Sequence, residues 1–176
     1  GRIGAVVADH LDPDDPLHRW AQGLERGLAG TQLQGFLNGS IDLTLRQTVD
    51  GNPRFSVIDY KTNNLASDHA DPTLHSYRPA RLTRAMADNQ YALQALIYSV
   101  ALHRYLRWRL PNYDPALHLG PVGYLFVRGM VGDPTPSLIE DGRATRAGVF
   151  TWQVPPAVVA ELSELFAGPS TLGDRV

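Results

Sequence analysis

Two residues near the middle of the chain, Asp59 and Lys61, have types and a spacing that suit hydrolytic chemistry. They lie in the β-rich run Val57-Ile58-Asp59-Tyr60-Lys61, and side chains two residues apart on a strand leave the same face. An acid and a base would then share one surface. The chemistry open to such a pair is metal-assisted hydrolysis, in which the acid binds a cation and the ammonium group stabilises developing negative charge.

A second acid, Asp42, is predicted to lie across from this pair. The run Asp50-Gly51-Asn52-Pro53 is a dense turn signal between two β-rich segments, which predicts a β-hairpin. If the loop is a two-residue turn at Asp50 and Gly51, the strand register places Asp42 directly opposite Asp59. A three-residue loop would break this pairing.

Facing carboxylates repel each other unless a cation lies between them, so Asp42 and Asp59 form a candidate metal site. Their hard oxygen atoms suit Mg²⁺, or alternatively Mn²⁺, and the backbone carbonyl of Tyr60 is a further candidate ligand. Such a metal polarises a phosphate and acidifies a water molecule, while Lys61 orients that water or stabilises the transition state of phosphodiester hydrolysis. The spacing alone fits a solvated surface equally well, because acids and lysines often alternate on exposed strands.

The elements that must position these residues follow from hydrophobic periodicity. Alternation over 34–47, with Ile41 and Asp42 on opposite faces, predicts a strand. Helical spacing over 83–110, ended by Pro111, predicts the longest helix. The remaining predictions are helices at 3–10, 16–28 and 155–167 and strands at 55–60, 121–128 and 148–154. Helices on both sides of a set of strands indicate an α/β fold, with a mixed β-sheet flanked by helices.

Bulk composition limits these interpretations. The chain has 176 residues and a formal charge of -2, so it fits one domain, and any nucleic-acid contact must come from a local patch. It has no cysteine, which excludes disulfides and thiolate metal sites and favours a cytoplasmic location. No apolar run approaches the roughly 20 residues of a membrane helix, so no membrane partner is expected. Because the chain begins at Gly1 without a methionine, we expect 1–176 to be a single domain cut from something longer.

The acidic cluster Asp12-Pro13-Asp14-Asp15-Pro16 has two interpretations. Its carboxylates are candidate oxygen ligands for a cation. Aspartates beside prolines, however, usually begin helices, because the acids accept hydrogen bonds from the first backbone amides. The helix-capping interpretation is favoured.

Several segments of the chain resemble one known family. Gly39-Ser40-Ile41-Asp42-Leu43 and Val57-Ile58-Asp59-Tyr60-Lys61-Thr62-Asn63 resemble the motifs of the PD-(D/E)xK nucleases, and specifically of RecB-type nuclease domains. Tyr91-Ala92-Leu93-Gln94-Ala95-Leu96-Ile97-Tyr98 resembles the Q-x-x-x-Y motif of that group, and Gly123-Tyr124-Leu125-Phe126-Val127-Arg128-Gly129 extends the similarity. The resemblance covers about 35–128 and implies a restriction-endonuclease-like core.

The resemblance also implies a role for each matching residue. Asp42 and Asp59 would hold the metal, Lys61 would be the catalytic lysine, and Gln94 and Tyr98 would face the site or its DNA. Positions i and i+4 share one face of a helix, so an amide and a phenol at Gln94 and Tyr98 can reach a backbone phosphate. Without the resemblance, ordinary packing of Tyr98 is an equally good explanation.

A basic and partly aromatic helix end follows the Q-x-x-x-Y motif. Arg104 is the candidate DNA-binding residue there, with Arg107, Arg109 and the Trp108 ring beside it, because cations and aromatic rings can follow a DNA strand. Cations near a helix C-terminus also suit the helix dipole without any ligand.

RecB-type nuclease domains carry a metal-ligand histidine on a helix upstream of the first motif aspartate, and usually an acid on the preceding strand. His10 and His18 are the only histidines ahead of Asp42, and neither lies in a segment that resembles that helix. We therefore expect the chain to lack this upstream helix and strand and to hold only part of the metal shell, which weakens magnesium binding.

Three functional hypotheses result. The first is a magnesium-dependent deoxyribonuclease of the exonuclease V type, acting on DNA in double-strand break repair and recombination. Its partners would be RecC-like and RecD-like subunits and the helicase part of the same chain. The second is a catalytically silent domain of the same fold that binds DNA or a partner subunit. The third is a structural domain whose Asp-Tyr-Lys strand is surface decoration, and the motif matches in family order argue against it.

Overall fold

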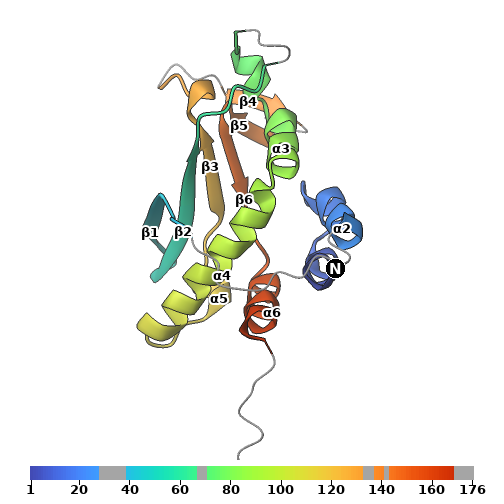
Figure 1. The fold of residues 1–176 in the computed structure, drawn as a ribbon. Coiled ribbons are helices and arrows are strands. Elements are labelled where there is room, and N and C mark those ends of the chain that lie inside the picture. The colour runs from blue at the N-terminus through green and yellow to red at the C-terminus, as the bar shows by residue number, and fades with distance from the viewer. Residues whose placement is uncertain (28–38, 67–70, 133–136, 141–142, 169–176) are drawn as a thin grey trace, which may run out of the picture.

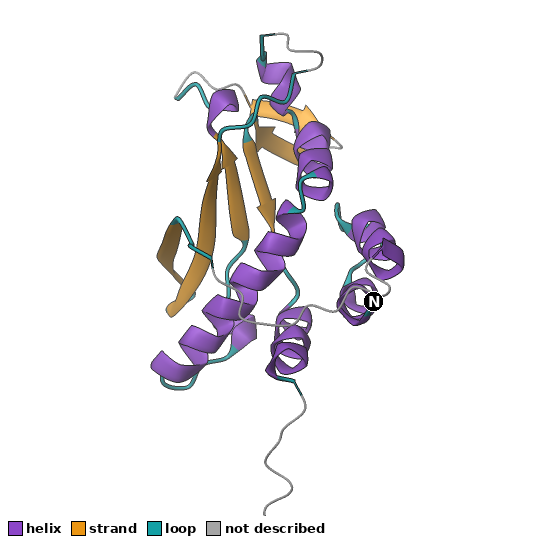
Figure 2. Ribbon diagram, in the orientation of Figure 1, coloured by secondary structure: helices purple, strands orange, loops and turns teal. Residues whose placement is uncertain are grey.

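The structure, a computed structural model, describes residues 1–27, 39–66, 71–132, 137–140 and 143–168. In these residues a mixed four-stranded sheet is flanked by helices, which confirms the predicted α/β class and is consistent with a restriction-endonuclease-like fold (Figures 1 and 2). The longer helices are α1 (Arg2–His10), α2 (His18–Gly27), α3 (Pro79–Asp88), α4 (Tyr91–Arg109) and α6 (Pro156–Ala167). The central strands are β1 (Leu43–Val49), β2 (Asn52–Lys61), β3 (Val122–Phe126) and β6 (Val149–Trp152).

The order of the central sheet is β1-β2-β3-β6, and only its middle pair is parallel. Consecutive parallel strands need a long crossover connection, and α3, α4 and the short α5 (Pro115–His118) lie in the connection from β2 to β3. The parallel register sets Asp59 beside Tyr124. The crossover therefore brings a helix over the strand that carries the Asp-x-Lys pair.

The hairpin formed by β1 and β2 has the predicted register. Asp50 and Gly51 both have positive φ, 49° and 79°, as a two-residue type I′ turn requires. The pairing runs from Val49 opposite Asn52 to Leu43 opposite Ile58. The predicted two-residue loop and its register are therefore confirmed, and one further step of that register would set Asp42 across from Asp59.

The helices pack into one core with the sheet. Helix α4 crosses one face of the sheet, and α6 lies against both α4 and α1 (Figure 1). The buried apolar side chains of these elements form a single cluster with β2, β3 and β6. Helix α4 is the longest of the described helices, with 19 residues, yet neither it nor any other in the described part has the length and apolar character needed to cross a bilayer.

The predicted helix over 83–110 is wrong in one respect, because it is two helices. Helix α3 ends at Asp88, α4 begins at Tyr91, and Gln90 between them has a left-handed backbone with φ 59°. The Asn89 side chain donates to the Ala85 carbonyl and so satisfies an acceptor at the end of α3. No glycine or proline marks this break, which is why periodicity alone passes over it.

Other differences lie at the ends of elements and in a second sheet. The strand predicted over 34–47 begins only at Leu43, and residues 28–38 lie outside the described part. The strand predicted over 121–128 ends at Phe126, where a 3-10 turn (Val127–Gly129) follows. A hairpin of β4 (Ser137–Glu140) and β5 (Arg143–Arg146) was not predicted, because its alternating pattern is short and mostly polar.

The positive φ of Gly51 predicts a measurable cost for a side chain at that position. Gly51→Ala meets no atom within 4 Å, so the strain of the left-handed backbone should lower the free energy of unfolding by about 1 kcal/mol. Gly23, in α2, also has open space around it, and Gly23→Ala should raise stability by about 0.5–1 kcal/mol. Urea unfolding of both variants checks the opposite signs, and equal effects would contradict the turn geometry.

Candidate active site

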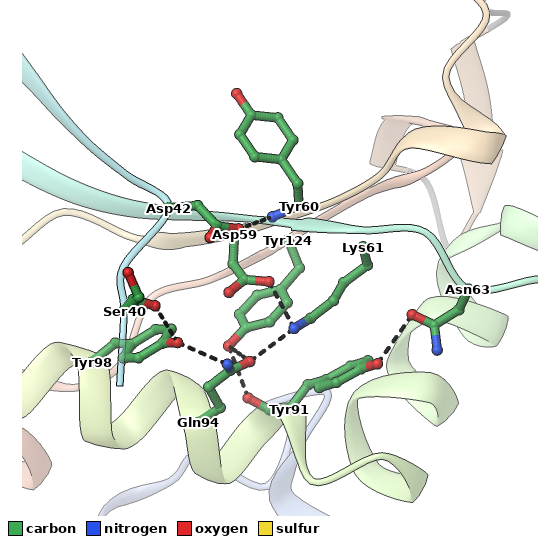
Figure 3. A network of polar contacts seen from close by, with 10 residues as sticks. All are labelled: Ser40, Asp42, Asp59, Tyr60, Lys61, Asn63, Tyr91, Gln94, Tyr98 and Tyr124. Carbon is green, nitrogen blue, oxygen red and sulfur yellow. Dashed lines mark hydrogen bonds and ion pairs between the residues drawn. The ribbon is translucent and has the colours of Figure 1, made fainter. Parts of the chain in front are cut away.

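An ion pair between Asp59 and Lys61 lies at the carboxyl end of β2. Lys61 Nζ is 2.7 Å from Asp59 Oδ2, and the two side chains are only 13% and 5% exposed. Because they are two residues apart on a strand, both leave the face of the sheet that α4 covers (Figure 3). The surface interpretation of this pair is therefore wrong, since both charges are largely withdrawn from water.

Asp42 joins the pair from the start of β1. Its Oδ2 accepts a hydrogen bond from the backbone N–H of Tyr60 at 3.0 Å, which fixes one carboxylate oxygen beside β2. The Asp42 side chain is exposed, in contrast to Asp59. The Tyr60 ring points away from the site on the opposite face of the sheet, so only the backbone of Tyr60 belongs to it (Figure 3).

Helix α4 supplies an amide that connects the lysine to two phenols. Gln94 Oε1 accepts hydrogen bonds from Lys61 Nζ at 3.0 Å and from the Tyr124 hydroxyl at 3.1 Å. Gln94 Nε2 donates to the Tyr98 hydroxyl at 2.9 Å, and that hydroxyl donates to the Ser40 carbonyl at 2.6 Å. The predicted pair Gln94 and Tyr98 therefore lies at the site and extends from the lysine to the segment just ahead of β1.

Two aromatic rings complete the surroundings of the lysine. Lys61 Nζ lies 4.0 Å from the centroid of the Tyr91 ring and 5.3 Å from that of Tyr124, within the range of cation–π attraction. The two rings are stacked, with centroids 6.0 Å apart, and the Tyr91 hydroxyl donates to Asn63 Oδ1 at 3.0 Å. The sequence predictions omitted Tyr91 and Tyr124 as site residues. Position i−3 from Gln94 was a usable signal for Tyr91, since residues three apart share a helix face.

Tyr124 also fixes the orientation of the Gln94 amide. Burial raises the pKa of Tyr124 well above its usual range, and the nearby Asp59 carboxylate adds to the shift. The hydroxyl therefore stays protonated at neutral pH and acts as a donor to Gln94 Oε1. With its oxygen facing Tyr124 and Lys61, the amide must turn its NH₂ group toward Tyr98.

The donor set suits a hard divalent cation, although it is small. Asp59 Oδ2 is buried and, apart from the lysine ammonium beside it, has no hydrogen-bond partner. With Asp42 and the Tyr60 carbonyl it gives two carboxylates and one carbonyl, and Mg²⁺ commonly binds one or two carboxylates together with water and phosphate. No cluster of three or more acids, histidines or cysteines that could hold a metal occurs within the described ranges.

Arg104 lies elsewhere on α4. Its Nε donates to the Ser163 hydroxyl at 3.0 Å and its second guanidinium nitrogen to the Ser163 carbonyl at 2.5 Å, which joins α4 to α6. Two of its donors are thus engaged within the protein. Its predicted contact with DNA stays a prediction, and the site described above does not include it.

The acidic cluster and the two early histidines are also separate from the site. Asp12 and Asp15 accept hydrogen bonds from backbone amides two residues further on, in the turns just ahead of α2, and Asp15 also accepts from Trp152 Nε1. His10 pairs with Glu161 at 2.8 Å, and His18 Nδ1 contacts the Leu11 carbonyl. These contacts give both histidines structural partners.

The mixed sheet flanked by helices, with a buried Asp-x-Lys pair covered by α4, is consistent with a restriction-endonuclease-like fold. The comparisons with curated proteins are more specific. The RecBCD enzyme subunit RecB of Mycolicibacterium smegmatis is 46% identical over 164 residues, and that of Mycobacterium tuberculosis H37Rv is 49% identical over 164 residues. RecB of Escherichia coli K12 is 35% identical over 167 residues.

Each of these alignments covers 93% of the chain. The chain is therefore a homologue of part of RecB and matches a fragment of its C-terminal nuclease domain. It spans 14% of the length of the mycobacterial relatives and 12% of the Escherichia coli relative. No family model matches the chain.

Removal of the Tyr124 hydroxyl should destabilise the protein even though the aromatic ring remains. In Tyr124→Phe, the Gln94 oxygen and the Tyr91 carbonyl lose a buried donor, and the free energy of unfolding should fall by about 1–3 kcal/mol. The matched change Tyr105→Phe removes an exposed hydroxyl and should alter stability by less than about 0.5 kcal/mol. Denaturant titration compares the two, and equal values would mean that the Tyr124 bonds contribute nothing.

Proposed function

We propose that the chain is a metal-dependent DNA nuclease that hydrolyses phosphodiester bonds as part of a RecBCD-like helicase–nuclease in double-strand break repair and recombination. The observation that carries the proposal is the buried Asp59–Lys61 pair with the Asp42 carboxylate held beside it by the backbone N–H of Tyr60. The name of the relatives, RecBCD enzyme subunit RecB, supports the assignment to DNA repair.

Asp42, Asp59 and the Tyr60 carbonyl are the residues that would hold the cation, Mg²⁺ or alternatively Mn²⁺. When bound, the metal would neutralise charge on the scissile phosphate and lower the pKa of a water molecule. Asp59 is suited to this role because its carboxylate is buried and its Oδ2 has no partner besides the Lys61 ammonium. Asp42 is suited because one of its oxygens is anchored by Tyr60 N–H while the side chain remains exposed.

Lys61 supplies the positive charge that the transition state requires. Its ammonium group is held by Asp59, by Gln94 Oε1 and by the Tyr91 ring, so little reorganisation is needed when a phosphate arrives. In this position it can orient the attacking water or stabilise the pentavalent phosphorus. Gln94 and Tyr98, on the same helix face, would border the site or its DNA, as the family resemblance implies, and their hydrogen bonds to each other and to Lys61 would hold that lysine in place.

The partners of the domain are proposed on the same basis. DNA is the substrate, and the RecBCD name of the relatives points to RecC-like and RecD-like subunits and to a helicase part of the same polypeptide.

One observation favours a second candidate function. The described residues hold only two carboxylates at the site and no third acid or histidine in a cluster with them. A domain with this donor set binds metal weakly, and it would then serve as a catalytically silent domain that binds DNA or a partner subunit.

Site substitutions should remove DNA cleavage while the fold remains. Asp59→Asn keeps the side-chain volume but removes the negative charge. Asp59→Asn, Asp42→Asn and Lys61→Gln, each made as a single variant, should reduce cleavage of linear DNA in Mg²⁺ by at least about 100-fold. The exposed Asp9, on α1, gives a matched control, and Asp9→Asn should cleave normally.

The assay uses this chain and the longest natural polypeptide that contains it, each with and without a chelator. Circular dichroism establishes that each variant is folded. Chelation should abolish cleavage. If the longer polypeptide leaves DNA intact in Mg²⁺ and Mn²⁺, or if Asp59→Asn cleaves at the normal rate, the nuclease proposal fails and the silent domain replaces it.

The ring of Tyr91 should matter more for turnover than its hydroxyl does. Tyr91→Leu removes the cation–π contact with Lys61, which is worth about 0.5–2 kcal/mol, so kcat should fall about 2- to 30-fold with little change in KM. Tyr91→Phe keeps the ring and loses only the bond to Asn63, so its kcat should stay near the normal value. Equal losses in both variants would assign the effect to the hydroxyl instead.

A further inference from the structure

The helix face that carries Gln94 and Tyr98 continues beyond the site toward the C-terminal end of α4. At 3.6 residues per turn, Ala101, Tyr105 and Trp108 all lie within about 40° of Gln94 around the helix axis. We call these three residues the α4 stripe. All three are exposed, whereas Tyr98 is buried. The face of α4 that carries Gln94 and Tyr98 is therefore covered near the site and exposed to solvent near the C-terminal end of the helix.

The stripe holds the two most exposed aromatic side chains among the residues that the structure describes. Trp108 is 75% exposed and Tyr105 is 54% exposed. Large aromatic side chains usually bury most of their surface in a core. A pair of open rings on one helix face thus presents two stacking platforms.

Positive charge accompanies the rings. The Arg109 guanidinium carbon lies 4.4 Å from the centre of the Trp108 ring, and Arg109 pairs with no acid in the described residues. Arg46 on β1 is also exposed, and it lies four residues after Asp42, so the alternation of an extended chain puts the two side chains on the same face. Arg107, by contrast, contacts Glu164 at 3.4 Å and so turns toward α6. Arg109 therefore supplies an exposed cation beside the Trp108 ring itself.

We propose that the α4 stripe binds the single-stranded part of the DNA next to the cleaved bond, with bases stacked on Tyr105 and Trp108 and a phosphate near Arg109. This inference rests on the proposed function. Aromatic rings interleaved with arginine suit single strands, because unpaired bases stack on the rings while the cations contact phosphates. The positive charge and the continuity with the site favour DNA over a protein ligand, whose docking surface would need no guanidinium over the ring.

The length of the helix sets the reach of this contact. Fourteen residues separate Gln94 from Trp108, or about 21 Å along the axis at 1.5 Å per residue. This distance corresponds to about six nucleotides at the roughly 3.4 Å axial rise per nucleotide of a strand in a duplex, and to fewer if the strand is extended. An oligonucleotide of twelve nucleotides can therefore contact both the site and Trp108, whereas one of two nucleotides cannot.

The test measures binding without cleavage. The Asp59→Asn chain, in chelator, is titrated against a fluorescein-labelled twelve-nucleotide oligothymidylate, and anisotropy reports the dissociation constant. Trp108→Ala in this background should weaken binding about 5- to 150-fold, as expected for one lost base stack, and Trp108→Phe should restore most of the affinity. Ile139→Ala is the matched control, because Ile139 is an apolar side chain that is 80% exposed elsewhere on the surface.

Tryptophan emission gives a second readout. The chain has three tryptophans, of which Trp152 is only 2% exposed and Trp20 is partly buried against Trp152, so Trp108 should account for most of the quenching by unlabelled oligothymidylate. Trp108→Phe should remove most of that quenching. The proposal is overturned if Trp108→Ala binds as tightly as Ile139→Ala, or if Trp108→Phe is quenched as strongly as the unsubstituted protein.

The two proposals fail separately. If the unsubstituted protein cleaves DNA but Trp108→Ala does not change the affinity, the proposed role of the stripe is rejected and the nuclease proposal is retained. If binding depends on Trp108 but no form of the protein cleaves DNA, the stripe is retained as a contact for single-stranded DNA and the nuclease proposal is rejected.

Discussion

The contact on which the rest of the site depends is the buried ion pair between Lys61 and Asp59. Taking two charges out of water costs several kcal/mol each, and their attraction offsets this cost only if other groups also solvate them. At this site those groups are Gln94 Oε1 and the faces of Tyr91 and Tyr124. All three come from elements far from β2 in sequence, so the charged pair can exist only once the helix and the third strand have packed against it.

This requirement explains why the chain breaks between α3 and α4. If α3 and α4 formed one continuous helix, Tyr91 would lie in its interior, and the axis of α4 would have to follow the axis of α3. The left-handed Gln90 instead lets α4 begin at Tyr91 in its own direction, and the first two turns of α4 then carry both the ring and the amide that face Lys61. An uncapped residue with positive φ is unfavourable by itself, and such strain persists only where the surrounding structure fixes it.

The sequence predicted the features that depend on residues close together in the chain, and it missed those that depend on residues far apart. The pairing of Asp42 with Asp59 was predictable, because the two-residue turn at Asp50 and Gly51 fixes the register locally. Gln94 and Tyr98 were reached through the family resemblance rather than through spacing. Tyr124 was not assigned to the site, because its place beside Asp59 depends on a parallel pairing across a crossover of some sixty residues. The surface interpretation of the Asp-x-Lys pair failed for the same reason, since the burial comes from a distant helix.

The Q-x-x-x-Y spacing on α4 has a structural meaning that follows from these contacts. Gln94 binds the lysine at the end of β2, and Tyr98, one turn later, binds the Ser40 carbonyl just ahead of Asp42. One helix face thus holds both ends of the hairpin that carry the two acids. Beyond the last pair of the β1–β2 ladder, this helix contact and the bond from Tyr60 N–H to Asp42 help to hold Asp42 beside Asp59. The four-residue spacing therefore lets two side chains one helix turn apart reach two neighbouring strands. A shift of either residue by one position would rotate its side chain about 100° around the helix axis, away from the site.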